Sequence, residues 1–504
     1  MRPYIFIMLL ISPLVFGCES FLSEVPDDRT ELKDVESIKA LLVSAYPEGH
    51  YMLQGEWMSD NADDKGTWQV SVYPQMQEEA YKWEESSTND YDSPNKYWDA
   101  CYKAIAAANH ALEAIDNLGN TAELKPYRGE ALVARAYAHF MLVNFWGKHY
   151  NPATVATDLG VAYVEEPERE ALVIYTRKTV KEVYDLIERD LTEGLPLLRD
   201  NAYDVAKYHF TKAAGAAFAA RYYLYRGDAW DKVQDYCTEV LGEGTGYKDQ
   251  LRNYTQNYLP VSSNVIEYMK LYTNYGEPAI LLLTNGVSVW WRAECFSRYG
   301  LSLSKKNEIF PDNDPVCGGK LIYPIFGAAP TYVLYKSYEY FKNTYPGSTT
   351  GRPYVFCAAL TIEEVVLNRA EAYTMTKDYE GALADINTFL SMRITSYNPT
   401  SHTVTLEKVK RFYSEQKNSI ELAPWYKDQM DADQMLMLKY ITDLRRREFC
   451  SEGMRWFDVK RFYIEVTHKE YGTSNQSVLT KDDPRRLLQI PVSAVSYGME
   501  PNPR

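Results

Sequence analysis

A short stretch near the C-terminal end gathers the residue types that could bind a nucleic acid. Residues 445 to 462, RRREFCSEGMRWFDVKRF, hold six Lys or Arg against three Asp or Glu, with Trp456, Phe457 and Phe462 among them. Cationic side chains neutralise phosphates, and aromatic rings stack on bases. The same residue types also form buried ion pairs around packed rings.

The overall charge of the chain decides between these two interpretations. The 504 residues carry a formal net charge of -15, and the sequence pI is near 5.1. A chain this acidic has no general affinity for a phosphate backbone, and a local positive excess in it is typical of internal ion pairing. We therefore expect no nucleic-acid partner.

The other residues that could take part in catalysis are not spaced as in known catalytic motifs. The seven His are scattered, and the sequence contains no HExxH, GxSxG or Walker lysine motif. Acidic residues are plentiful, so a glycosidase carboxylate pair stays open, but nothing singles out one pair. We expect no enzyme, no cofactor and no metal site. The stretch NADD, Asn61 to Asp64, could form a calcium loop or simply a turn.

The first residues, MRPYIFIMLLISPLVFGC, have the character of a targeting segment. Arg2 precedes an apolar run from Tyr4 to Phe16 that is too short to span a bilayer, and Cys18 follows Gly17 as in a bacterial lipoprotein cleavage box. We expect a signal peptide over 1–17, a lipid on Cys18 and an acidic tether over 18–30. An ordinary secretory signal with a chance Cys is the alternative. The six other Cys show no metal-like spacing, and we expect mainly free, buried thiols.

Helical periodicity recurs along most of the remaining chain. One helix is predicted over about 180–194, where Thr179 and Glu182 form a capping box, and another ends before Gly147. Similar patterns cover about 97–116, 208–226, 229–241, 361–376, 379–393 and 434–450. The stretches AARYYLYRGDAWDKVQDYCTEVL and RAEAYTMTKDYEGALADINTFL both have the form of a tetratricopeptide-type hairpin. The predicted fold is all-α, with a tetratricopeptide-like scaffold over about 97–242 and 356–465.

Two segments, about 51–96 and 243–355, lose this periodicity and gain Gly, Pro, Asn and aromatic residues. Long irregular segments in a compact protein are usually functional, and these are too aromatic to be disordered. Aromatic rings can cover the apolar face of a sugar while polar side chains bind its hydroxyls. The ligand-binding candidates in these segments are Trp57, Trp68, Trp83, Tyr272, Tyr275, Trp290 and Trp291. The plainer alternative is that each one packs in the core or against a partner.

The stretch 445–462 resembles the C-terminal motif of the SusD/RagB family, which are surface lipoproteins of Bacteroidetes. The matching positions are Arg445, Arg446, Glu448, Glu452, Gly453, Arg455, Trp456 and Asp458, whereas Leu444 and Met454 depart from the family pattern. Segments such as CESFLSEVPDD, YWDACYKAIAAANHALEAI and LLQIPVSAVSYGMEPNPR are also similar to the family, in the same order along the chain.

This resemblance implies one SusD-like domain over 31–504 on the outer membrane, lipid-anchored and facing the exterior. It implies capture of a glycan and delivery to a TonB-dependent, SusC-like transporter. A peptide-binding member of the family, a surface glycoside hydrolase and a pure scaffold are the rival functions. We interpret the motif as structural, with Arg446, Glu448, Glu452, Gly453, Arg455, Trp456 and Asp458 forming ion pairs and core.

Overall fold

The computed structural model describes residues 32–66, 72–170, 173–416 and 420–504. The expected signal peptide, the lipidated Cys18, the tether and the candidate Trp68 lie outside these residues. Within them, no helix is long and apolar enough to cross a membrane. The six described Cys are free, and all but Cys295 are buried, as expected.

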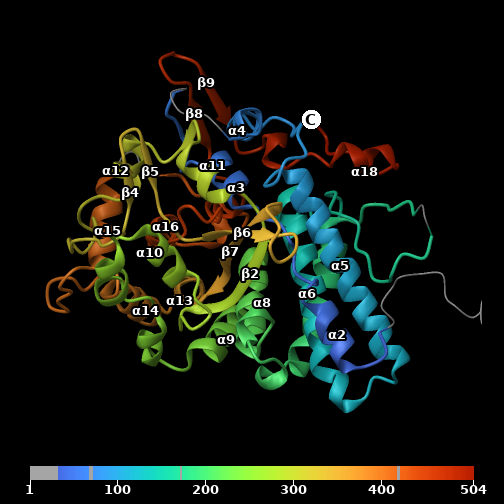
Figure 1. Ribbon diagram of the computed structural model, residues 1–504. Coiled ribbons are helices and arrows are strands. Elements are labelled where there is room, and N and C mark those ends of the chain that lie inside the picture. Colours follow the sequence, from blue (N-terminus) through green and yellow to red (C-terminus); the bar gives the residue numbers. More distant parts are fainter. Residues whose placement is uncertain (1–31, 67–71, 171–172, 417–419) are drawn as a thin grey trace, which may run out of the picture.

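Long helices in the first half of the chain pack in sequence order. They are α5 (Pro94–Asn117), α6 (Lys125–Trp146) and α7 (Val180–Gly194), with the short α2 (Val35–Leu42) lying across α5 and α6 (Figure 1). Helix α7 begins with the predicted capping box, in which Thr179 and Glu182 satisfy each other's backbone N–H groups. Helix α6 ends at Trp146, before Gly147, also as predicted.

A second group of helices joins segments that are far apart in sequence. It contains α8 (Lys212–Arg226), α9 (Trp230–Leu241), α13 (Ile362–Met375), α14 (Tyr379–Ser391) and α16 (Ala432–Glu448). Helix α9 packs against α13, and α13 packs against both α14 and α16. The two predicted hairpins therefore stack directly, although the chain makes a long excursion between them. The predicted all-α, tetratricopeptide-like scaffold is confirmed.

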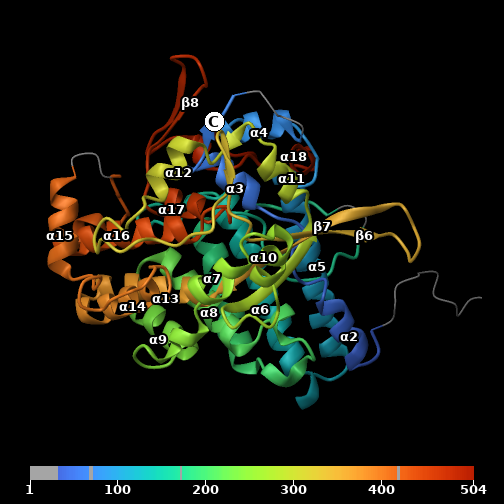
Figure 2. The same cartoon turned by 60° about the vertical axis from the view of Figure 1, so that its left-hand side comes forward.

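The excursion between α9 and α13 contains more regular structure than the sequence indicated. Its elements are α10 (Val265–Tyr272), β2 (Ile280–Val287), α11 (Trp290–Cys295), β3 (Tyr299–Gly300), α12 (Leu303–Ile309), β4 (Phe326–Ala328), β5 (Thr331–Val333), β6 (Tyr338–Asn343) and β7 (Gly351–Thr361). Strands β2, β7 and β6 form an antiparallel sheet in that order, and the β6–β7 hairpin projects from the body (Figure 2). The expectation of an irregular insertion missed this sheet, because β2 and β7 pair across about 70 residues of chain.

The segments before α5 and after α16 pack around the insertion. The first contains α3 (Met52–Met58), β1 (Asp63–Asp64) and α4 (Pro74–Tyr81), so the region predicted as irregular at 51–96 is partly helical. Strand β1 pairs with β3, and α3 contacts α11, which joins this segment to the insertion (Figure 1). The remaining elements are α15 (Leu406–Glu415), α17 (Arg455–Arg461), β8 (Val466–Lys469), β9 (Gln476–Leu479) and α18 (Val492–Ser496).

Candidate functional site

Four of the predicted ligand-binding residues are buried, as the alternative of core packing expects. Trp57 is 0% exposed, Trp290 1%, Tyr272 2% and Trp83 4%. The Trp83 indole N–H donates to the Met58 carbonyl at 2.8 Å, and its ring stacks with a histidine ring. Trp57 and Trp290 belong to the main hydrophobic core. The short helices α3 and α11 turn these rings inward, and helix pattern alone could not show this for elements of one or two turns.

Two predicted residues remain accessible, and the structure does not bring them together. Tyr275 is 58% exposed in the loop after α10, and Trp291 is half-buried in α11. The Trp291 backbone N–H contacts Glu339 of β6, whereas Tyr275 lies near Tyr208, and Tyr208 also lies near Tyr340. Residues 339 and 340 point to opposite faces of the sheet. Tyr275 and Trp291 therefore lie on either side of strand β6.

Two carboxyl groups position the Trp291 ring. Glu339 on β6 accepts a hydrogen bond from the Trp291 backbone N–H at 2.9 Å. Asp92, which precedes α5, accepts one from the Val289 N–H at 3.0 Å. These bonds satisfy N–H groups at the start of α11 that have no partner within the helix. The turn that carries Trp291 is therefore fixed from two separate elements.

Burial raises the pKa of both of these carboxyl groups. It raises the pKa of Asp92 to about 7, although hydrogen bonds from Ser288 and Val289 oppose the shift. Burial also raises the pKa of Glu339, against the effects of the Trp291 N–H and of Arg292. Perturbed carboxyl groups can mark an acid–base site. Here both groups already bind the backbone of one turn, which favours a positioning role over catalysis.

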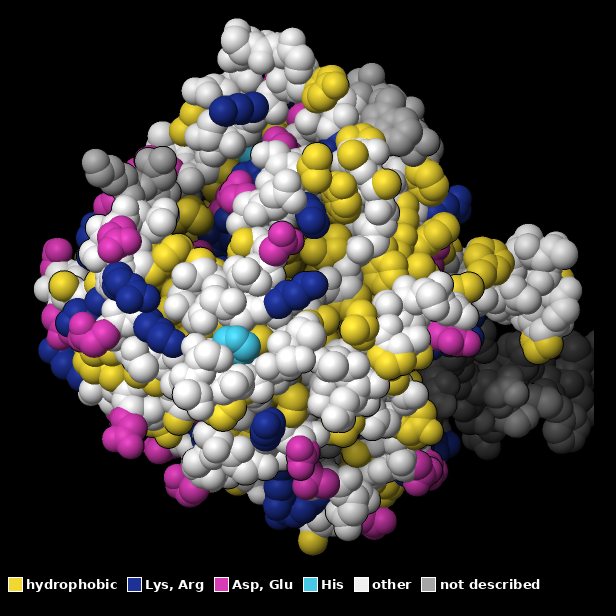
Figure 3. Space-filling model, turned by 90° about the vertical axis from the view of Figure 1, so that its left-hand side faces the viewer, with side chains coloured by type: hydrophobic (Ala, Val, Ile, Leu, Met, Phe, Trp, Pro, Cys, Tyr) yellow, Lys and Arg dark blue, Asp and Glu magenta, His cyan; other side chains and the backbone are white. Residues whose placement is uncertain are grey.

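One aromatic side chain, Tyr335, lies directly beside Trp291, and Tyr73 lies near Glu339. The Tyr335 hydroxyl lies beside the Trp291 indole and 3.3 Å from the Cys295 sulfur. Burial and the negative charges of Asp92 and Asp90 raise the pKa of Tyr73. Tyr91 and Glu339 make smaller contributions in the same direction. We call this region the Trp291 surface, and it consists of Trp291, Arg292, Tyr335, Glu339, Tyr73 and Tyr91. Figure 3 shows hydrophobic side chains gathered across the right half of the face that carries the insertion.

A ladder of rings covers the other face of the sheet. Tyr338 pairs with Phe356 across β6 and β7, and Tyr340 pairs with Tyr354. The Tyr340 ring is stacked at 5.2 Å from Phe356 and at 6.0 Å from Tyr354. The Asn285 amide donates to the Tyr340 hydroxyl at 2.8 Å. The sequence analysis missed these half-buried rings, because their common face depends on strand pairing.

An open groove on the first helix group is also lined by aromatic side chains. It measures about 430 Å³ and lies between α5, the 162–175 loop and the C-terminal segment. Trp98, Tyr102, Tyr175 and Tyr497 line it together with Asp99 and Glu168. Trp98 is only 5% exposed, whereas Tyr497 is 62% exposed. Trp98 falls on the helical pattern of α5, and that pattern alone does not indicate that its ring borders a groove.

The 445–462 stretch is buried and internally paired. Arg445 and Arg461 both pair with Asp458, at 3.2 and 3.1 Å, and Trp456 is 0% exposed. Other partners come from outside the stretch. Arg455 makes two hydrogen bonds to Asp60, at 2.7 and 2.9 Å, and Arg446 pairs with the same carboxylate at 3.3 Å. These arginines thus hold the α3–β1 connection against the scaffold.

The two glutamates of the stretch hold the insertion. Glu448 accepts two hydrogen bonds from Arg393, each at 2.8 Å. Burial alone would raise the pKa of Glu448, but the Arg393 guanidinium outweighs it and the pKa is lowered. Glu452 pairs with Lys336 at 2.9 Å and accepts from the Tyr272 hydroxyl at 3.1 Å. Tyr272 therefore belongs to this buried network and not to an exposed platform.

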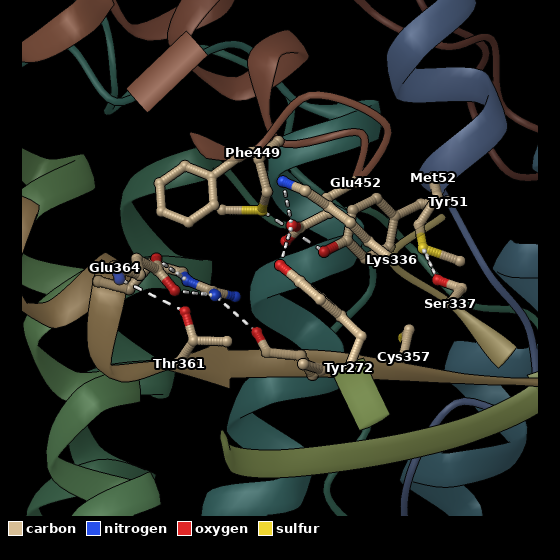
Figure 4. Close-up of a pocket in the computed structure, with 14 residues that line it drawn as sticks. Tyr51, Met52, Tyr272, Lys336, Ser337, Cys357, Thr361, Glu364, Phe449 and Glu452 are labelled. Atoms are coloured by element: carbon tan, nitrogen blue, oxygen red, sulfur yellow. Dashed lines mark hydrogen bonds and ion pairs between the residues drawn. The ribbon is translucent and has the colours of Figure 1, made fainter. Parts of the chain in front are cut away.

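A cavity adjoins this network beside β7 (Figure 4). Glu452 lies there between Lys336 and Tyr272, while Arg221 is paired with Glu364. The cavity has a volume of about 20 Å³. One or two water molecules fit this space, and a sugar ring does not. The cavity is thus a gap inside the charge network.

Two family models match separate parts of this chain. A family model described as "Starch-binding associating with outer membrane" matches residues 20–224, and a model of the SusD family matches residues 331–497. The second match contains the whole 445–462 stretch. Among curated proteins, no sequence matches the chain significantly.

Several solved structures share the fold. A SusD superfamily protein from Bacteroides thetaiotaomicron VPI-5482 is 20% identical with a TM-score of 0.65, covering 93% of this chain and 98% of its own. A putative sugar binding protein from Bacteroides vulgatus ATCC 8482 is 18% identical with a TM-score of 0.65, covering 94% and 99%. A laminarin binding SusD-like protein is 16% identical with a TM-score of 0.57, covering 94% and 99%.

Proposed function

The chain belongs to the SusD/RagB family, and we propose that it is a cell-surface lipoprotein that captures a glycan and delivers it to a partner TonB-dependent transporter. In this proposal Cys18 carries the lipid, and residues 18–30 tether the domain to the outer membrane. The ligand would be an oligosaccharide or polysaccharide. The description of the family model and the binding properties named for two structural neighbours support this class of ligand.

The observation that carries the proposal is the Trp291 surface. Trp291 is a half-buried aromatic side chain. Its backbone N–H donates to Glu339, and the N–H of Val289, two residues earlier, donates to Asp92. A rigid ring costs little conformational entropy when it stacks on a sugar. Arg292, Tyr73 and Tyr91 supply hydrogen-bonding groups at its rim. Tyr275 and the ring ladder would offer a further contact across β6.

An oligopeptide ligand is the second candidate, because β6 is an edge strand. In the sheet order β2–β7–β6, the outer side of β6 has no strand partner among the described residues. An extended peptide can add a strand to such an edge through backbone hydrogen bonds. A hydrolase has less support, since Asp92 and Glu339 are already engaged with backbone N–H groups.

Titration calorimetry of the mature chain tests the proposal. The titrants are a panel of oligosaccharides and polysaccharides, and a peptide digest. The test variant is Trp291→Ala. The matched control is Tyr497→Ala, which removes an exposed aromatic side chain from the open groove. We expect glycan heat that is lost in Trp291→Ala and kept in Tyr497→Ala. Heat from peptides alone would favour the second candidate. Glycan heat lost only in Tyr497→Ala would move the site to the groove.

A further inference from the structure

A second pocket lies beyond the C-terminal end of α6, on elements that the Trp291 surface does not use. It measures about 410 Å³, and we call it the Lys460 pocket. The loop after α6, the end of α17 and the segment from 481 to 487 form its walls. The polar side chains that matter are Lys148, His149, Lys460, Tyr463, Lys481 and Arg486.

Two cations of this pocket are buried without a carboxylate partner. Lys460 is 4% exposed and Arg486 is 6% exposed. The Lys460 ammonium donates to the backbone carbonyls of Gly147, at 2.8 Å, and Asn144. Arg486 donates to backbone carbonyls only, including that of Ile464 at 2.7 Å. Carbonyl dipoles solvate these cations but leave their charge uncancelled.

Burial disfavours the charged form of both cations. Burial, with the nearby charge of Arg486, lowers the pKa of Lys460 to about 7. Burial also lowers the pKa of Arg486 to about 10, against the opposing effects of Asp483, Tyr463, Glu465 and Asp482. A bound anion would offset the desolvation of both cations.

The unused hydrogen-bonding capacity of His149 is an independent observation. This side chain lines the pocket and is 6% exposed, yet neither ring nitrogen forms a hydrogen bond to any residue that the structure describes. Burial and the charges of Arg461 and Lys460 lower the pKa of the imidazole well below its usual value, so the ring is neutral. The imidazole nitrogens are therefore available to a ligand that enters the pocket.

Cationic side chains outnumber acidic ones in the lining of the pocket. Asp483 is paired with Arg485 at 2.6 Å, and Lys148 is paired with Asp158 at 2.6 Å. The exposed Asp482 is then the remaining acid of the lining, against Lys460, Arg486 and Lys481. The Lys481 ammonium lies 5.6 Å from the centre of the Tyr463 ring.

We propose that the Lys460 pocket binds a compact anion, a carboxylate or sulfate group, carried on a body the size of a sugar ring. The cations and His149 would hold the anionic group, while Leu487, Pro484 and Pro503 contact the body. The volume falls within the range of small-molecule sites. This site is separate from the Trp291 surface, and it stands whether or not a glycan binds there.

The test is calorimetry of the mature chain with glucuronate, with glucose as the uncharged match and inorganic sulfate as a competitor. We expect glucuronate to bind at least about tenfold more tightly than glucose. Complete competition by sulfate would show that the anionic group alone is recognised, and weak competition would show that the sugar body contributes. Equal affinity for glucose and glucuronate, or no binding of either, would overturn the proposal.

Matched variants locate the binding. Lys481→Gln changes an exposed side chain of the pocket and should weaken glucuronate binding by about three- to tenfold. Lys248→Gln, an exposed lysine at a distant position in the sequence, should leave it unchanged. His149→Gln should weaken binding too. If that variant does not fold, Lys481→Gln alone decides the test. Unchanged affinity in Lys481→Gln, or an equal loss in Lys248→Gln, would contradict the assignment.

Discussion

The 445–462 stretch and the Trp291 surface contain the same kinds of residue but differ in where their charges find partners. In the stretch, Arg445 and Arg461 share Asp458, and Trp456 is completely buried. On the surface, Trp291 is half-buried, and the carboxylate of Glu339 holds its backbone. A short stretch of sequence that contains both aromatic and charged residues is therefore not enough to identify a binding site. Their burial and the completeness of their pairing separate structure from recognition.

Removing one partner of the buried network should have the largest effect. Arg393→Ala leaves Glu448 as a buried carboxylate without its guanidinium, and breaking such a pair costs about 3–5 kcal/mol of unfolding free energy. Urea denaturation measures this loss. Arg352→Ala, at an exposed position in β7, is the control and should change the free energy by less than about 0.5 kcal/mol. Similar costs for the two variants would contradict the structural role of the network.

The contact between the stretch and α3 depends on a glycine. Gly453 has a φ of +72°, and an added Cβ would lie 2.7 Å from the Met52 Cα. Gly472 has a φ of +73° and no atom within 4 Å of such a Cβ. Gly453→Ala and Gly472→Ala share the backbone strain, so their difference isolates the close packing.

We expect Gly453→Ala to lower the unfolding free energy by about 1–3 kcal/mol more than Gly472→Ala does. Thermal and urea unfolding of both variants measure this difference. Equal losses would mean that α3 moves away from the stretch at little cost, and the stretch would then have a weaker role in holding α3.

The sequence predicted what is local in this fold. The capping box at Thr179, the end of α6 before Gly147 and the interruption between α9 and α13 follow from nearby residues. The sheet did not, because β2 meets β7 only after a long excursion. The partners of the stretch also come from far away, with Asp60 and Arg393 as examples. Burial of Trp57 and Trp290 depends on tertiary packing, so residue type left both core packing and ligand binding open for them.

Asp92 allows a pH test of how the Trp291 turn is held. Burial raises its folded-state pKa to about 7, above the usual value of 3.8. The stabilisation that follows is complete below about pH 4 and is lost as the pH rises through about 7. The Asp92→Asn variant has no carboxyl group to ionise at this position. The difference between its unfolding free energy and that of wild type should therefore rise by about 1–3 kcal/mol, in favour of the variant, between pH 4.5 and pH 8. A difference that does not change with pH would mean that Asp92 is not held as a neutral carboxyl group.

Trp291→Ala should have the smallest effect on stability. The ring is half-buried, and we expect a loss of less than about 1 kcal/mol of unfolding free energy. Trp456→Ala, at the buried tryptophan of the stretch, should cost about 3–5 kcal/mol. The melting temperatures of the two variants report this contrast. A large loss for Trp291→Ala would identify this ring as core.

The most direct test of the account follows individual tryptophans by ¹⁹F NMR in protein labelled with 5-fluorotryptophan. Ten Trp give ten signals, and Trp→Phe variants assign those of Trp291, Trp456 and Trp57. On addition of an oligosaccharide that gives heat in calorimetry, we predict that the Trp291 signal shifts while those of Trp456 and Trp57 stay in place. If the Trp456 signal shifts and the Trp291 signal does not, the account is contradicted. Ligand binding would then involve the buried stretch and not the Trp291 surface.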